Sequence, residues 1–191
     1  MSKQISIDQA VEMIKDGMTV MIGGFLAVGS PNKIIEAMVK AGKKDLTVIC
    51  NDTSYPEIGS GLLVASGCVK KVIASHIGTN PITEQKMKEG TMEVELVPQG
   101  TLAERVRIGG AGIGGFLTAT GVGTLAAEGK RTIEVDGKEY LLELPLRADV
   151  ALIGASVADK HGNLIYRGTS QNFNPMMATA ADLVIAEVSE S

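Results

Sequence analysis

The 191-residue chain is poor in aromatic residues, cysteine and histidine, and each shortage narrows what it can be. Aromatic side chains make up 3 % of the sequence, and tryptophan is absent. Two histidines are too few for most zinc sites. The two cysteines, Cys50 and Cys68, follow neither a CxxC nor a metal-ligand spacing. We therefore expect no metal site and two buried, reduced thiols, as is typical of a cytoplasmic protein.

The sequence also lacks a basic patch, a long apolar segment and a signal peptide. Eighteen Lys and Arg against 22 Asp and Glu give a net charge of −4, which leaves no basic stripe to neutralise phosphates. The apolar runs fall short of the ~20 residues that a membrane span needs. The N-terminal 14 residues carry Asp8 and Glu12 and no long apolar core. We expect no nucleic-acid partner, no membrane association and a cytoplasmic location.

The overall composition is that of a soluble globular protein. Hydrophobic residues make up 45 % of the chain and charged residues 21 %. The length fits one domain spanning residues 1–191. Glycine is enriched, with 23 of 191 residues against a usual share of about 7 %.

Predicted strands at 18–22, 46–50, 70–75 and 92–97 alternate with segments of helical spacing or helix-start signals. This order predicts an α/β fold with an open, mostly parallel sheet and right-handed crossovers. Later segments break the alternation. The residues 132–142, around Asp136-Gly137, predict an antiparallel hairpin, and 150–157 with 164–166 predict a second one. A helix over 175–181 and a strand over 183–186 follow.

The middle of the chain carries signals for a capped helix and a loop. Thr101 and Glu104 form a capping-box pattern, which predicts a helix that begins there and closes at Gly109-Gly110. We expect Arg105 and Arg107 to be surface charges on it. The glycine-rich residues 111–123 show no period, so we expect a long irregular loop. A G-x-G-x-x-G match begins at residue 110, but the preceding helix argues against a dinucleotide site.

Three segments lie where parallel sheets bind ligands, at the carboxyl ends of strands. Gly23 to Gly29 joins a strand to a helix, so it is either a ligand-contacting loop or a tight turn that requires glycine. Asn51 follows the next strand directly, and it either donates its amide to a substrate oxygen or forms an Asx turn. Gln99 leaves a later strand and can reach the same cleft. We expect His76 to be a structural or rim histidine and not a general base, and His161 to be solvated, and the residues themselves indicate no nucleophile.

The same segments resemble the family I CoA-transferases, and the resemblance runs in order along essentially the whole chain. It is closest to the A (alpha) subunit of the short-chain acid enzymes of the acetate or butyrate–acetoacetate type. The matching motifs are residues 16–25, 29–31, 51–52, 78–81, 98–105, 109–112, 120–124 and 148–152, together with Asn172-Phe173-Asn174-Pro175.

The resemblance implies an α/β/α fold and a heterodimer or α2β2 heterotetramer of A and B subunits. CoA would be a substrate, with no permanently bound cofactor, and would pass through a glutamyl-CoA thioester in ping-pong fashion. The glutamate belongs to a Ser-Glu-Asn-Gly motif of the B subunit, and no glutamate in this chain precedes Asn-Gly. This chain alone should therefore be inactive.

The resemblance also implies roles for this chain's own residues. Asn51 and Gln99 would support the acyl oxyanion or the carboxylate. CoA contact would fall on Gly23, Gly24, Phe25, Leu26, Ala27, Val28 and Gly29. Acetyl-CoA, butyryl-CoA and acetoacetyl-CoA are the expected acyl donors. The alternative is a stand-alone module that binds acyl-CoA or an anion without catalysis.

Overall fold

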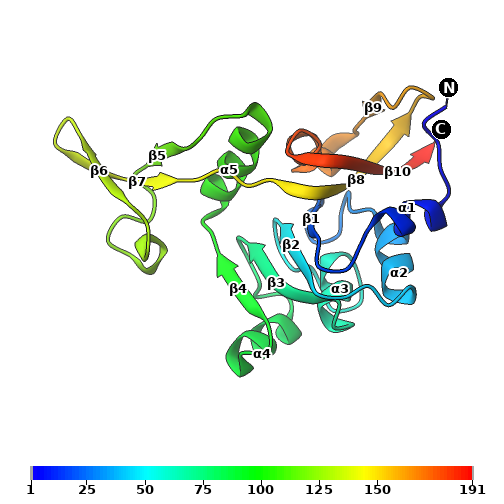
Figure 1. The fold of residues 1–191 in the computed structure, drawn as a ribbon, viewed down its shortest axis with the longest axis horizontal. Coiled ribbons are helices and arrows are strands. Elements are labelled where there is room, and N and C mark those ends of the chain that lie inside the picture. The colour runs from blue at the N-terminus through cyan, green and yellow to red at the C-terminus, as the bar shows by residue number, and fades with distance from the viewer. Residues whose placement is uncertain (1, 191) are drawn as a thin grey trace.

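The computed structural model describes residues 2–190 and contains one large sheet and one small sheet (Figure 1). The large sheet has the order β10-β8-β1-β2-β3-β4, and every neighbouring pair in it is parallel. A short strand, β9, pairs antiparallel with the end of β8 and confirms the second hairpin. The strands are β1 (Thr19–Ile22), β2 (Leu46–Cys50), β3 (Val69–Ala74), β4 (Glu93–Leu96), β8 (Ala148–Ala158), β9 (Leu164–Ile165) and β10 (Ala181–Glu190).

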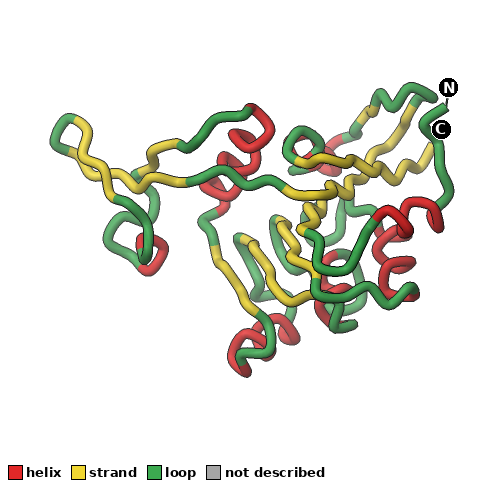
Figure 2. Tube along the Cα trace, viewed as in Figure 1, coloured by secondary structure: helices red, strands yellow, loops and turns green. Residues whose placement is uncertain are grey.

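Helices cover both faces of the large sheet, which confirms the α/β/α fold (Figure 2). Side chains of the first four helices pack into the core on one face, and those of the last two into the core on the other. The helices are α1 (Ile7–Met13), α2 (Asn32–Lys40), α3 (Ser60–Ala65), α4 (Pro81–Glu89), α5 (Gln99–Ala111) and α6 (Asn174–Met177).

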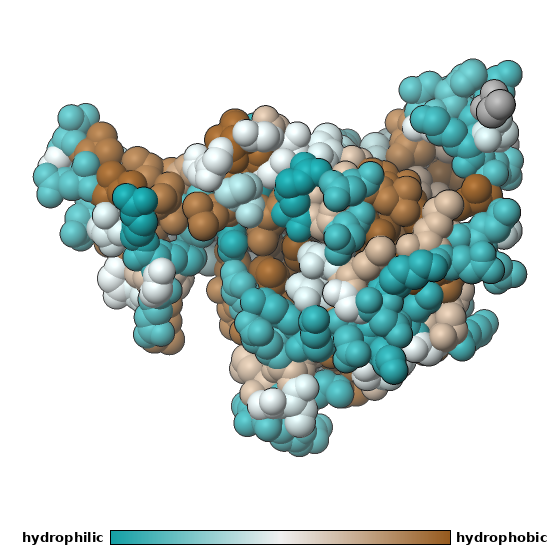
Figure 3. Space-filling model, viewed as in Figure 1, coloured by the Kyte–Doolittle hydropathy of each residue, from teal (hydrophilic) through white to brown (hydrophobic). Residues whose placement is uncertain are grey.

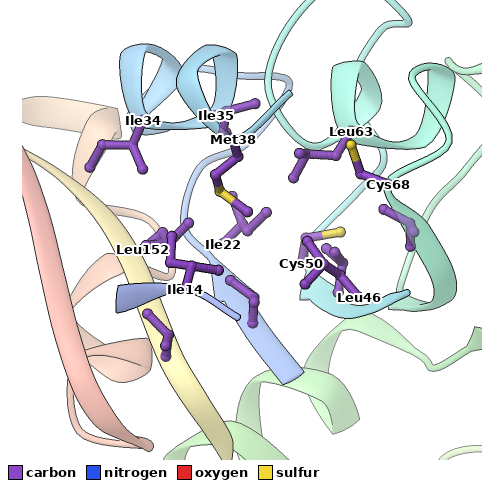
Figure 4. Close-up of a cluster of buried hydrophobic side chains, with 14 of the residues drawn as sticks. Ile14, Ile22, Ile34, Ile35, Met38, Leu46, Cys50, Leu63, Cys68 and Leu152 are labelled. Carbon is purple, nitrogen blue, oxygen red and sulfur yellow. The ribbon is translucent and has the colours of Figure 1, made fainter. Parts of the chain in front are cut away.

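The core on the first face is made almost entirely of aliphatic side chains (Figure 4). Ile22 and Leu46 point into it from neighbouring strands, and Ile35 and Met38 come from the buried side of α2. Strands buried on both sides need continuous apolar runs, which is why the sequence located them well. Both cysteines are free and buried in this core, as expected.

Helix α5 begins and ends at other residues than the capping-box pattern predicts. It starts at Gln99, directly after Pro98, and Leu102 N–H donates to the Pro98 carbonyl at 2.8 Å. Thr101 therefore lies inside the first turn, where its buried hydroxyl has no partner within the described chain. Glu104 pairs with Arg107 instead of capping the helix. The helix continues through Gly109-Gly110 to Ala111, and Gly112 in the left-handed region ends it.

The small antiparallel sheet forms an arm that projects away from the large sheet (Figure 1). It contains β5 (Phe116–Thr118), β6 (Thr132–Val135) and β7 (Lys138–Glu143) in the order β5-β7-β6. The β6–β7 hairpin around Asp136-Gly137 is confirmed. The expected loop over 111–123 is wrong in part, because β5 lies within it and pairs with β7. Figure 3 shows apolar residues at the surface of this arm.

A charge network fixes the arm to the body, and it corrects the expectation for Arg105. The Arg105 side chain is only 12 % exposed, and its Nη1 lies 2.9 Å from Glu95 Oε1 on β4. Its Nε donates to the Leu144 carbonyl at 2.8 Å. Glu143 of β7 is buried and pairs with Lys130. Arg107 is half exposed, as predicted.

Candidate functional site

The candidate site lies at the carboxyl ends of β1, β2 and β4. The chain runs from β1 outward to β4, whereas β8 and β10 lie on the other side of β1. The sheet order therefore reverses next to β1, which is where open α/β sheets form their ligand crevice. The loop 23–30 leaves β1 at this point, Asn51 follows β2, and Gln99 follows β4.

The structure brings the two predicted polar residues into direct contact. Gln99 Nε2 donates to Asn51 Oδ1 at 2.9 Å, although the two residues lie 48 positions apart. Asn51 is only 2 % exposed, whereas Gln99 is exposed. Ser75 Oγ, at the end of β3, donates to the Asn51 carbonyl at 2.7 Å and holds its backbone. Gln99 is thus the accessible end of the pair, and Asn51 is its anchor.

The next residue, Asp52, lies at the centre of this arrangement, and sequence reasoning missed its role. Its carboxylate is buried and accepts hydrogen bonds from Ser54 N–H at 2.7 Å and from Asn51 Nδ2 at 2.9 Å. It also accepts the N–H of Leu26, at 3.1 Å to Oδ2. The Asx turn considered for Asn51 is therefore formed by Asp52, whose oxygen bonds the residue two positions ahead.

The loop after β1 contains a strained two-residue hairpin. Phe25 and Val28 exchange both backbone hydrogen bonds, at 3.0 and 2.9 Å. The two residues between them, Leu26 and Ala27, have φ of +46° and +68°. Positive φ at both central positions is the geometry of a type I′ turn, which normally carries Asn-Gly. Non-glycine residues in such geometry cost about 1–3 kcal/mol each and cluster at functional sites.

Packing inside the molecule explains why glycine occurs at both ends of this loop. A Cβ at Gly23 would lie 1.7 Å from Asn174 Oδ1, and one at Gly24 would lie 1.9 Å from Ser30 Oγ. Gly23 and Gly24 are buried, and a Cβ at Gly29 would lie 2.5 Å from the Ser170 carbonyl. These glycines are therefore required by neighbouring side chains and backbone of the same chain.

The Asn172-Phe173-Asn174-Pro175 segment holds the same loop from the other side. Asn172 Oδ1 accepts the N–H of Gly24 at 3.0 Å, and its Nδ2 donates to the Val28 carbonyl at 3.1 Å. Asn174 donates to the Gly29 carbonyl at 3.0 Å and accepts Gly154 N–H at 3.1 Å. This segment is one of the motifs on which the family resemblance rests, and in the structure its two asparagine side chains hold the backbone of the loop 23–30 in place.

A polar cleft of about 350 Å³ adjoins the hairpin between the ends of β1, β8 and β10. Ala27 and Gly29 line it, and within residues 2–190 no hydrogen bond engages their N–H groups. The N–H groups of Gly23, Gly24, Phe25, Leu26 and Val28 are all used within the chain. Two of the seven loop residues therefore have a backbone N–H without a partner within residues 2–190.

The titratable side chains near the site supply no activated nucleophile. Burial, and then the charge of Asp52, raises the pKa of the Cys50 thiol to about 12, so this thiol stays protonated at neutral pH. His161 is exposed, as expected, and His76 is exposed too. Within residues 2–190, no group of three or more His, Cys, Asp or Glu could hold a metal ion. In the same described part, no helix is long and apolar enough to span a bilayer.

Comparison with known proteins identifies the family of this chain. The profile of the coenzyme A transferase family matches residues 4–191, nearly the whole chain. The chain belongs to the coenzyme A transferase family. It is 53 % identical over 189 residues to the acetate CoA-transferase subunit alpha of Escherichia coli, covering 99 % of this chain and 86 % of that protein.

A second relative agrees with this assignment, and a solved structure shares the fold. The chain is 55 % identical over 186 residues to the acetoacetyl-CoA:acetate/butyrate CoA transferase alpha subunit of Clostridium acetobutylicum, covering 97 % of this chain and 85 % of that protein. The crystal structure of glutaconate coenzyme A-transferase from Acidaminococcus fermentans shares the fold, with a TM-score of 0.86 at 18 % identity. It covers 99 % of this chain and 67 % of that one.

Proposed function

We propose that this family member is the A (alpha) subunit of a heteromeric, cytoplasmic CoA-transferase for short-chain acids. The observation that carries the proposal is similarity over nearly the full length to two proteins that are named alpha subunits. No glutamate in the printed sequence precedes Asn-Gly, so the proposal assigns the nucleophilic glutamate to a partner subunit. Acetyl-CoA, butyryl-CoA and acetoacetyl-CoA are the proposed donors.

The proposed reaction moves CoA in two half-reactions. The partner's glutamate carboxylate attacks the thioester carbonyl, and the CoA thiolate leaves to give a mixed anhydride. The thiolate then attacks the glutamyl carbonyl, which releases the product carboxylate and leaves a glutamyl-CoA thioester. A second carboxylate takes CoA by the reverse steps. Each attack places negative charge on a carbonyl oxygen, so N–H donors at that position accelerate the reaction.

In this proposal, Gln99 supplies such a donor and Asn51 holds it in place. Gln99 is exposed at the carboxyl edge of the sheet, and its Nε2 keeps a second N–H beyond the one given to Asn51. CoA would lie along the hairpin, where Ala27 and Gly29 line the cleft and have backbone N–H groups without a partner within residues 2–190. Phe25 and Val28 are exposed there and offer apolar contact.

The test begins with assembly. The chain is purified from its native host, its mass is measured under native conditions, and any partner is identified. We expect a heteromer, with a second chain that carries Ser-Glu-Asn-Gly and with CoA transfer between acetoacetyl-CoA and acetate. A homo-oligomer without transfer would contradict the proposal and favour a stand-alone acyl-CoA or anion-binding module.

Substitution of Gln99 tests the site in the assembled enzyme. We expect Gln99→Ala to lower kcat at least tenfold, because removing one oxyanion donor costs about 10²–10³-fold in well-studied cases. Gln85→Ala is the matched control, since Gln85 is a glutamine on α4 that bonds only Glu89. If both variants keep the kcat of the unsubstituted enzyme, Gln99 does not contact the reacting atoms.

A further inference from the structure

The hydrogen bonds that join Gln99, Asn51 and Asp52 run in one direction. Gln99 Nε2 donates to Asn51 Oδ1, and Asn51 Nδ2 in turn donates to Asp52 Oδ2. An amide carries a donor on one side and an acceptor on the other, so each side chain can be turned either way. A carboxylate only accepts. The chain of bonds therefore ends on the one group that cannot be reversed.

We propose that Asp52 is a positioning residue that sets the orientation of both amides. Because its carboxylate faces Asn51, the NH2 group of Asn51 must point toward it and Oδ1 must point toward Gln99. Gln99 then has to place its NH2 group beside Asn51. This inference rests on the proposed function, since it assigns the Gln99 N–H to the substrate oxygen. If the hydrogen bonds ran in the opposite direction, the side-chain carbonyl oxygen of Gln99 would face the substrate oxygen and repel it.

Asp52 also ties this pair to the strained hairpin. The N–H of Leu26 donates to both carboxylate oxygens, at 3.3 Å to Oδ1 and 3.1 Å to Oδ2. The carboxylate thus contacts the Gln99–Asn51 pair on one side and the hairpin on the other. A substitution at Asp52 changes both, so the test must separate the two effects.

The Asp52→Asn variant should reverse the direction of the hydrogen bonds that join Gln99, Asn51 and residue 52. Ser54 N–H donates to Oδ1 at 2.7 Å, and this backbone group cannot turn around. The new amide must keep its oxygen there and place its NH2 group at the Oδ2 position, facing Asn51 Nδ2. Two donors then oppose each other, so Asn51 turns over and Gln99 follows. We expect kcat of the assembled enzyme to fall at least tenfold with little change in KM for acyl-CoA.

Exchanging the two side chains restores the orientation of Gln99, although the hydrogen bond between residues 51 and 52 then runs the other way. In the double variant Asn51→Asp with Asp52→Asn, the new amide at 52 donates to the carboxylate at 51, whose other oxygen accepts Gln99 Nε2 as before. The contact between Leu26 N–H and the side chain of residue 52 changes in the same way in both variants, because residue 52 is asparagine in each. We expect the double variant to recover kcat to within about threefold of the original enzyme.

The control is Asp149→Asn, which alters a carboxylate that also accepts a backbone N–H, from Thr19 at 2.7 Å, but that bonds no amide of the site. It should leave kcat unchanged. Asp52→Asn with the original kcat would overturn the proposal. A double variant no more active than Asp52→Asn would also overturn it, because the loss would then come from the hairpin.

A second readout does not depend on catalysis. The side-chain amides of Asn and Gln are labelled with ¹⁵N in the assembled protein and observed by NMR. We expect the Gln99 NH2 signals to move in Asp52→Asn and to return in the double variant. Unmoved Gln99 signals would refute the orientation argument. If the unsubstituted protein transfers no CoA, the proposed function fails, whereas the NMR result still decides whether Asp52 orients the two amides.

Discussion

At Gly24 the chain leaves β1 with φ of +121° and with the Ser30 hydroxyl in the place that a Cβ would take. The Ser30 Oγ donates to the Gly23 carbonyl at 2.8 Å, so it is not free to move away. The requirement for glycine thus arises within the loop itself. This differs from the simpler idea that glycine leaves room for a ligand.

The residue-scale prediction compares two glycines. Gly24→Ala should lower the free energy of unfolding by about 2–4 kcal/mol, because backbone strain and overpacking add. Gly100→Ala should raise it by about 0.5–1 kcal/mol, since Gly100 lies in α5 with open space around it and alanine favours helices. Urea unfolding without CoA measures both. If Gly24→Ala weakens only CoA binding and leaves stability intact, the packing explanation is wrong.

At the residue scale the sequence located Asn51 and Gln99, but it predicted neither the contact between them nor the role of Asp52. Both residues follow apolar strands, and parallel strands end at the same edge, so their proximity could be predicted. Asp52 could not be singled out, because a carboxylate after a strand is usually a turn residue. Asp52 contacts Asn51 and Leu26 only because Leu26 and Ala27 form a hairpin turn with positive φ values. A Leu-Ala pair in a sequence does not predict such a turn.

At the scale of elements, burial decided what the sequence could predict. The apolar residues of β1, of β2 and of the second half of β3 are buried, and the positions of these strands were predicted within one or two residues. Helix α5 was misplaced because Thr101 and Glu104 match a capping box, whereas Pro98 supplies the first helical carbonyl. The short β5 has no apolar period, since its structure comes from pairing with β7.

The element-scale prediction concerns the attachment of the arm to α5 and β4. Arg105→Met should cost about 2–4 kcal/mol of stability, because it leaves the Leu144 carbonyl without its donor and removes the cation that Glu95 and buried Glu143 share in a largely buried site. Arg107→Met removes an exposed pair with Glu104 and should change stability by less than about 1 kcal/mol. Equal effects of the two substitutions would contradict the network described here.

The effect of Arg105→Met should also depend on pH. Burial raises the pKa of Glu95, but hydrogen bonding and charge from Arg105, with Lys71, outweigh it and hold that pKa below its ordinary value of 4.5. A lowered pKa contributes stability that is present above the ordinary value and lost as pH falls through the folded-state value. The difference in free energy of unfolding between the unsubstituted protein and Arg105→Met should therefore become smaller below pH 4.5.

At the scale of the whole molecule, the sheet order places the site. The order in which strands are added to the sheet reverses next to β1, so that the loop 23–30 lies between the ends of β2 and β8. Alternation of strands and helices predicts a parallel sheet, but strand order depends on which edges pair, and local sequence does not encode that. The direction in which the arm leaves the large sheet likewise depends on packing, so the local sequence does not predict it.

The two parts of the molecule bury very different amounts of their strands. In β1, Val20, Met21 and Ile22 are almost completely buried. In the three strands of the arm, only Leu141 and Glu143 are buried. Regions with few buried apolar contacts open at lower free energy than the core. The amides of β6 and β7 should therefore exchange through a local opening, several kcal/mol below the global value of about 5–15 kcal/mol.

Native-state hydrogen exchange at increasing, sub-denaturing urea concentrations measures this difference. Local opening exposes little surface, so exchange in the hairpin should depend weakly on urea, whereas exchange in β1 should follow global unfolding. Arg105→Met should speed exchange in the hairpin more than Arg107→Met does, because Arg105 bonds the residue that follows β7. Hairpin and β1 amides with the same urea dependence would show that the arm unfolds only together with the large sheet.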